Sequence, residues 1–316
     1  MKRIIALALM ALALSSCSTG VKSVSLVAHD SFVISDDLIN KFEKDSGYEL
    51  KIIRAGDVGA MTSKLVLTKD SPIADAVYGI DNTFAPVAEN NEIIDGGLTA
   101  IDYADVCFNV DLEYFNQNNL ALPTSWIDLT ESKYKNLTVI ENPNTSSTGL
   151  AFLASTYAKF NNPEKWWISL RDNGVKVAAS WEDAYYTDFS GSAGKGKYPI
   201  VLSYSSSPAD EVDDAGNPKT QSLSNDCFRQ TEYAGVLRNS QNSAGAKALV
   251  EFLLSDAFQK SLPESMYVYP VKDVGLPKSW ANNAKPARSF IGEDLDIQAN
   301  RDKWLAQYNY IFDVAP

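Results

Sequence analysis

Short clusters of carboxylate, hydroxyl and aromatic side chains stand where predicted strands end. Open α/β sheets bind ligands at the carboxyl ends of their strands, so these clusters together predict a ligand site. The clusters are His29-Asp30-Ser31-Phe32, Asp57, Gly79-Ile80-Asp81-Asn82, Thr145-Ser146-Ser147-Thr148-Gly149, Trp181-Glu182-Asp183-Ala184-Tyr185, Ser203-Tyr204-Ser205-Ser206-Ser207-Pro208 and Tyr267-Val268-Tyr269-Pro270.

The charged members of these clusters are suited to a cationic or amine-bearing solute. Asp30, Asp57 and Asp81 carry carboxylates that can pair with a cation or accept from an exocyclic amine. The alternative is that they are helix caps or solvated turn residues. His29 has a comparable alternative, as a histidine whose hydrogen bonds are satisfied within the protein.

The aromatic members can form flat walls for a ring or a cation. Trp181, Tyr204 and Tyr267 are the candidates, and a well-placed ring contributes about 0.5–2 kcal/mol to binding a cation. Packing in the core is the usual alternative for a single aromatic residue. The Thr145 to Gly149 stretch precedes a predicted helix and offers hydroxyls and free N–H groups to an anion. It serves equally well as a plain helix N-cap.

Nothing in the sequence nominates a catalytic or metal centre. The chain has one histidine and no CxxC spacing, so a metal site is not expected. It lacks a GxSxG nucleophile elbow and no motif pairs a nucleophile with a base. A secreted hydrolase that uses a carboxylate pair remains the alternative from another class. We therefore expect a binding protein without enzyme activity or cofactor.

The first residues predict export. Lys2 and Arg3 precede an apolar run from Ile4 to Leu14, which is a signal-peptide pattern and is shorter than the roughly 20 residues of a membrane-spanning helix. Leu14-Ser15-Ser16-Cys17 resembles the bacterial lipobox, so residues 1–16 are expected to be removed and Cys17 to be lipidated. An ordinary cleaved signal with a chance cysteine is the alternative. The expected location is the outer face of the cell membrane.

The mature chain is acidic. Loss of Lys2 and Arg3 moves the formal net charge from -12 to -14. A nucleic-acid partner would need a basic face, so none is expected. Cys107 and Cys227 remain after lipidation of Cys17, and export favours a disulfide between them, with two free buried cysteines as the alternative.

Alternating short strands and helices indicate an α/β fold. The first segments, 23–29, 36–44, 48–53, 60–67 and 75–79, follow a strand-helix-strand-helix-strand order that predicts parallel strands with crossover helices. About 300 residues exceed what one hydrophobic core usually serves, so two lobes are expected. We predict a tether at 17–22, a first lobe at 23–104 and 232–316, and a second lobe at 105–231. The strands at 103–110 and 228–237 would be the crossovers, stapled by the disulfide.

In order along the chain, the clusters resemble those of the thiamine-binding periplasmic protein family. The phrases that carry the resemblance are HDSF, ADAVYGIDN, PNTSSTGLAFL, WEDAY, IVLSYSSSPA, AFQKSLPESMYVYPV and RDKWLAQY, spread over almost the whole mature chain. WEDAY with LSYSSSPA is the most specific combination. The resemblance implies a type II periplasmic binding fold with a mixed sheet flanked by helices in each lobe, which closes on thiamine or its phosphates for an ABC importer's permease.

The resemblance also implies roles for individual residues. Trp181 and Tyr204 would pack on the ligand rings, Asp57 would lie near the vitamin, and Ser146 and Ser147 would face the phosphate end. Tyr267 stands where relatives often carry tryptophan, and His29 where a tyrosine is common. The full set of expected ligand-binding residues is His29, Asp30, Ser31, Asp57, Asp81, Ser146, Ser147, Trp181, Tyr185, Tyr204, Ser206 and Tyr267.

Two other cargoes are compatible with these residues. Tyr185-Tyr186 resembles the adjacent tyrosines of ferric-iron binders, a sister family, although successive residues on a helix point about 100° apart and only one would face a cleft. A polyamine would suit carboxylates and aromatics equally well. A monomer is expected in each case.

Overall fold

The computed structural model describes residues 22–194, 196–292 and 294–313. The predicted signal peptide and Cys17 lie outside these residues. Within the described ranges, no helix has the length and apolar character that crossing a membrane requires.

A mixed β-sheet runs through the molecule in the order β2-β1-β3-β8-β4-β7-β5-β6, with β9 paired to β4. β1 pairs in parallel with β2 and with β3, which confirms the parallel start predicted from the sequence. The strands are β1 (Lys22–Ala28), β2 (Tyr48–Arg54), β3 (Ala76–Asp81), β4 (Ile94–Asp111), β5 (Thr138–Glu141), β6 (Lys176–Ala178), β7 (Ile200–Tyr204), β8 (Thr220–Leu237) and β9 (Tyr269–Pro270).

Helices cover the sheet, and several begin or end at residues suited to that position. Ser35 caps α1 with its hydroxyl and Gly47 ends it in the left-handed conformation that glycine adopts without strain. Pro163 stands in the first turn of α6, where its missing N–H costs no hydrogen bond. The helices are α1 (Asp36–Ser46), α2 (Val58–Leu67), α3 (Ala85–Asn90), α4 (Leu112–Gln117), α5 (Ser147–Lys159), α6 (Pro163–Asp172), α7 (Ser243–Leu253), α8 (Asp256–Met266), α9 (Lys278–Asn283) and α10 (Ile297–Phe312).

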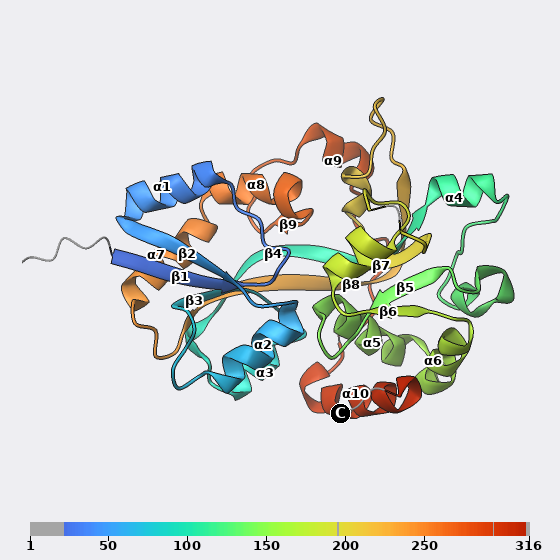
Figure 1. Cartoon of the computed structure of the whole chain (residues 1–316), viewed down its shortest axis with the longest axis horizontal. Helices are drawn as coiled ribbons and strands as arrows, with labels where there is room; N and C mark the ends of the chain where they lie inside the picture. The colour runs from blue at the N-terminus through green and yellow to red at the C-terminus, as the bar shows by residue number, and fades with distance from the viewer. Residues whose placement is uncertain (1–21, 195, 293, 314–316) are drawn as a thin grey trace, which may run out of the picture.

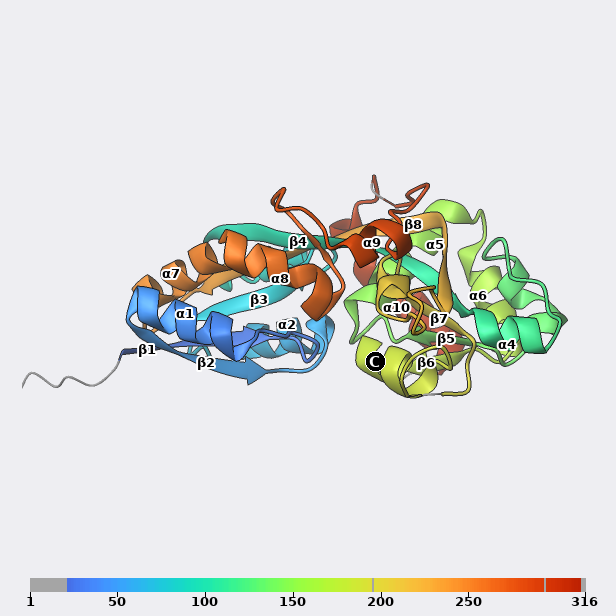
Figure 2. The same ribbon diagram turned by 90° about the horizontal axis from the view of Figure 1, so that it is seen from above.

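Two long strands, β4 and β8, connect two lobes (Figures 1 and 2). They pair antiparallel from Ile94↔Leu237 to Asp111↔Thr220, with register shifts on the way. Toward its carboxyl end β8 pairs with β3 in the first lobe, whereas toward its own carboxyl end β4 pairs with β7 in the second. We propose that the chain passes between the lobes near residues 104–105 and 231–232.

The C-terminal helix lies with the second lobe, which differs from the expectation that 232–316 belongs wholly to the first. α10 packs against α5 and α6. Its Tyr308 ring meets Trp167 of α6 edge to face at 5.3 Å, and its Trp304 stacks on Tyr157 of α5 at 4.9 Å. Burial of these large rings fixes the helix there, because aromatic side chains remove much apolar surface from water.

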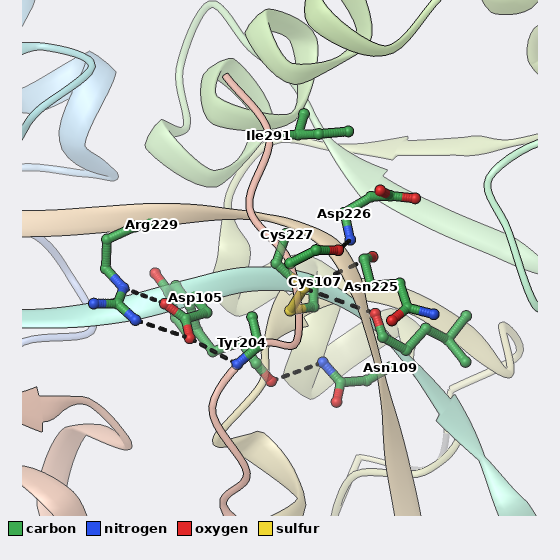
Figure 3. Close-up of a disulfide and its surroundings, with 12 residues drawn as sticks. Asp105, Cys107, Asn109, Tyr204, Asn225, Asp226, Cys227, Arg229 and Ile291 are labelled. Atoms are coloured by element: carbon green, nitrogen blue, oxygen red, sulfur yellow. Dashed lines mark hydrogen bonds and ion pairs between the residues drawn. A yellow bond between two sulfur atoms is a disulfide. The ribbon is translucent and has the colours of Figure 1, made fainter. Parts of the chain in front are cut away.

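A disulfide joins Cys107 of β4 to Cys227 of β8 (Figure 3), as predicted. Both cysteines are buried, and they lie where the β4–β8 register shifts between Val106 and Phe108. Nearby, Arg229 of β8 is paired with Asp105 of β4 (Figure 3). The link therefore fastens the two strands close to the point at which they pass between the lobes.

Candidate functional site

A cavity of about 160 Å³ lies between the two lobes. The first lobe supplies residues from the turns after β1 and β2, from β8, and from the end of α8. The second lobe supplies the start of α5, the segment around Trp181, and the end of β7. The lining residues are His29, Ser31, Val33, Asp57, Val58, Ser147, Trp181, Glu182, Tyr186, Tyr204, Glu232, Ser265, Met266, Tyr267 and Val268.

His29 follows β1 and lies on the cavity wall beside Glu232. Its Nε2 is buried, 3.6 Å from Glu232 Oε2, and the ring packs on the backbone of β3 at Gly79. A Cβ at Gly79 would lie 2.2 Å from His29 Cδ2, so only glycine fits there, and its φ of +98° also favours glycine. Burial lowers the pKa of His29, but the carboxylates of Glu232, Asp57 and Glu182 together outweigh it, and the pKa is raised.

Asp57 caps α2 and bonds across to the second lobe. Its Oδ1 accepts from the Val58 N–H at 2.6 Å, and its Oδ2 accepts from the Trp181 N–H at 2.9 Å. Burial raises the pKa of the Asp57 carboxyl, although these N–H donors oppose the shift. Asp57 lines the cavity as expected, but both of its oxygens already have partners.

Aromatic rings form one wall of the cavity. Trp181 and Tyr204 lie 5.7 Å apart, and Trp181 Nε1 donates to Ser203 Oγ at 2.9 Å, which holds the indole in place. Tyr185 does not line the cavity. It is buried behind Trp181 and stacked on it at 5.0 Å, while Tyr186 faces the cavity instead. The two tyrosines lie in a π-helical turn, Asp183–Asp188, and point apart as successive residues of a helix do, so only one of them faces the cavity.

The expected hydroxyl residues divide between the wall and the layer behind it. Ser147, at the start of α5, lines the cavity and accepts from Gln230 Nε2 at 2.8 Å. Ser146 is fully buried and pairs with Thr148. Ser206 is also buried, and its hydroxyl donates to the Tyr267 carbonyl, which supports the left-handed residue that ends α8. Ser31 and Tyr267 line the cavity.

Asp30 and Asp81 do not line the cavity. Asp30 is exposed, and its Oδ1 accepts from the Gly56 N–H at 3.0 Å, which joins the turns after β1 and β2. Asp81 is fully buried and accepts from the Thr83 hydroxyl and the Phe84 N–H. Burial, with Glu232 nearby, raises the pKa of Asp81 to about 7. Asp30 and Asp81 are therefore turn and cap residues, which was the alternative predicted from the sequence.

Acidic side chains stand side by side on adjacent strands beneath the cavity. In the sheet, Glu232 is the register partner of Asp81 on β3 and of Asp102 on β4. The Tyr78 hydroxyl donates to Asp102 Oδ2 and lies 3.3 Å from Glu232 Oε2. Burial and the nearby Glu232 carboxylate raise the pKa of Asp102 well above its usual range. Proton uptake by these neighbours relieves the repulsion between like charges, and a positive charge in the cavity would interact favourably with an acid that stays ionised.

Several lining residues were missed from the sequence: Val33, Val58, Glu182, Tyr186, Glu232, Ser265, Met266 and Val268. Glu182 and Val268 belong to clusters already singled out, and Tyr186 follows one directly. Glu232 had no comparable signal, because it lies inside a strand. In the part of the chain that the structure describes, no group of three or more histidine, cysteine or acidic side chains is placed to hold a metal ion.

Two lobes joined by paired crossover strands, with a cavity lined from both sides, define a solute-binding protein of the type II periplasmic class. The chain matches the model of the bacterial extracellular solute-binding protein family over residues 62–297 and belongs to that family.

Known proteins resemble the chain over most of its length. The thiamine-binding periplasmic protein of Salmonella typhimurium is 27% identical over 287 residues, which cover 84% of this chain and 85% of that protein. A solved periplasmic thiamin binding protein superposes with a TM-score of 0.77 at 24% identity, over 93% of this chain and 96% of the other. The ferric binding protein of Campylobacter jejuni superposes with a TM-score of 0.68 at 17% identity, over 92% of this chain and 99% of that protein. The two structural matches show the fold that thiamine and iron binders share.

Proposed function

We propose that this protein binds thiamine or a thiamine phosphate in the interlobe cavity, without a reaction, and delivers it to the permease of an ABC importer. The observation that carries the proposal is an aromatic wall, Trp181 with Tyr204, in the same cavity as the buried carboxylate of Glu232. Thiamine has flat rings and a permanently cationic thiazolium, which these groups suit. The thiamine-binding relatives span most of the chain and support the same cargo.

The hydroxyl side of the cavity suits a phosphate end. Ser147 lies at the N-terminus of α5, a helix of 13 residues, where backbone N–H groups and the helix dipole favour an anion. The thiazolium would then lie toward Glu232 and the hydroxyethyl or phosphate arm toward Ser147. We further propose that the mature protein is a monomer held to the membrane by a lipid on Cys17.

A thermal-unfolding comparison tests the cargo. The mature domain is melted alone and with thiamine, thiamine monophosphate, thiamine diphosphate, spermidine or ferric citrate. A ligand at 100 times its dissociation constant adds about 2.7 kcal/mol to the free energy of unfolding. We expect a raised midpoint with at least one thiamine form and none with ferric citrate. No shift with any thiamine form would overturn the proposal, and a shift with spermidine alone would replace it with a polyamine.

A further inference from the structure

Three carboxylates line the cavity, and their surroundings differ. They belong to Asp57, Glu182 and Glu232. Asp57 has both oxygens engaged, one by the Val58 N–H and one by the Trp181 N–H. A carboxylate that already accepts two backbone donors has less capacity left for a ligand. Asp57 therefore holds α2 and Trp181 in place and is a poor counter-ion.

Glu182 and Glu232 differ in their access to water. Glu182 is partly exposed on the segment that begins the π-helical turn, so water and salt screen its charge. Glu232 is 6% exposed and lies inside β8, where a charge interaction is several times stronger than at the surface. Of the two, Glu232 interacts more strongly with a charge in the cavity.

One oxygen of Glu232 is left for a ligand. The contacts from Tyr78 and His29 both reach Oε2, at 3.3 and 3.6 Å. Among the described residues, no N–H or hydroxyl group donates a hydrogen bond to Oε1, and the carboxyl of Asp102 is the further group in hydrogen-bonding contact with the Glu232 side chain. Asp81 and Asp102 lie beside Glu232 on the two neighbouring strands. His29 is the basic group in contact with the Glu232 carboxylate. Burial raises the pKa of Asp102 well above its usual range, so its carboxyl holds a proton and does not compete with Glu232 for a cation in the cavity.

We propose that Glu232 is the counter-ion of the ligand's positive charge and sets the preference of this site for a cationic solute. Tyr78 and His29 act as positioning residues that fix the carboxylate by its other oxygen. This inference rests on the proposed function, because it takes the thiazolium of thiamine as the charge that Glu232 meets.

The inference is tested by substituting Glu232 and measuring the affinity of the variant for three ligands. Thiamine is cationic and bears the exocyclic amine, oxythiamine keeps the cation but lacks that amine, and thiochrome is an uncharged analogue. Affinities are measured by calorimetry for the wild type and for Glu232→Gln, which keeps the side-chain shape and removes the charge. We expect thiamine and oxythiamine to bind about 10- to 100-fold more weakly to Glu232→Gln, the size typical of a lost bond to a charged group. Thiochrome affinity should stay within about threefold.

The control is Glu141→Gln, which replaces a buried carboxyl that does not line the cavity and whose pKa is raised well above its usual range by burial. It should bind thiamine within about threefold of the wild type. Glu182→Gln should lose less affinity than Glu232→Gln. Melting of each ligand-free variant checks that it folds, and Glu232→Asp, which retains the charge, should keep the preference for thiamine over thiochrome if the glutamine variant does not fold.

Each outcome separates the inference from the proposed function. Equal loss for thiamine and oxythiamine supports the counter-ion. A loss confined to thiamine would identify Glu232 as the acceptor of the amine and overturn the inference. Unchanged thiamine affinity in Glu232→Gln would also overturn it. In both cases the wild type still binds thiamine, so the proposed function stands. A wild type that binds no thiamine form overturns the proposed function and this inference with it.

Discussion

At the scale of single residues, Asp57 shows how one side chain can serve both the stability of an element and the shape of the cavity. It caps α2 and also accepts from the Trp181 N–H. Asp57→Ala should cost about 0.5–2 kcal/mol of unfolding free energy through the lost cap, and should weaken thiamine binding because Trp181 loses its anchor. Asp57→Ser should restore a cap, but the serine side chain is too short to reach the Trp181 N–H. Melts and titrations should therefore show recovered stability without recovered affinity, and wild-type affinity in Asp57→Ser would contradict the anchor.

Asp81 gives a prediction for pH. Its pKa is raised to about 7 by burial, against about 3.9 for an unfolded aspartate, so the folded state holds the proton more tightly. Stability from this group is fully present below pH 4 and is lost as the pH rises through 7, by up to about 1.4 kcal/mol per pH unit. Asp81→Asn should remove this loss. The difference in unfolding free energy between variant and wild type should grow from pH 5 to pH 8 in denaturant titrations, and a constant difference would refute the prediction.

The sequence identified seven of the cavity residues, all at element ends or in turns, and gave no signal for Glu232, which lies inside a strand. His29, Ser31, Asp57, Ser147, Trp181, Tyr204 and Tyr267 line the cavity, and each lies at the end of an element or in a turn. Glu232 reaches the cavity because β8 lies between β3 and β4, a register that depends on contacts between residues far apart in the chain. Tyr185 was expected in the cavity and Tyr186 lies there instead, because which of two successive helical residues faces the cavity depends on how the turn packs against Trp181.

At the scale of elements, periodicity predicted the short strands and helices well but not the long strands. The segment 103–110 was recognised, whereas β4 begins at Ile94 and passes through Gly96 and Gly97, residues that indicate a turn when read alone. The place of α10 in the second lobe depends on contacts with Trp167 and Tyr157, which are distant from it in sequence. Local pattern therefore gives the type of an element and not its neighbours.

The disulfide between β4 and β8 is an element-scale feature with a measurable effect. It closes a separation of 120 residues, and cross-links of this kind contribute about 2–5 kcal/mol, chiefly by restricting the unfolded chain. The double variant Cys107→Ala with Cys227→Ala should lower the unfolding free energy by that amount. Thiamine affinity should stay within about threefold, since neither cysteine lines the cavity. Denaturant titration with and without reductant makes the comparison: reductant should destabilise the wild type and leave the variant unchanged.

At the scale of the whole molecule, the proposed capture of a ligand between the lobes would bring them together, and α2 marks one place where they touch. The Gly59 N–H donates to the Thr145 carbonyl at 2.9 Å, and a Cβ at Gly59 would lie 2.7 Å from that oxygen. Backbone atoms do not tolerate such a contact, so Gly59→Ala should hold the lobes apart. Alanine also favours the helix by about 0.5–1 kcal/mol over glycine, so the open, ligand-free form should melt no earlier than the wild type.

Gly59→Ala is therefore expected to separate affinity from stability. Thiamine should bind at least about tenfold more weakly, and small-angle scattering should show a radius of gyration that no longer falls when thiamine is added. Ser63→Ala, an exposed position on the same helix, is the matched control and should behave as the wild type in both measurements. Wild-type affinity and compaction in Gly59→Ala would mean that this contact takes no part in closure, because a side chain at position 59 would then be accommodated in the closed form.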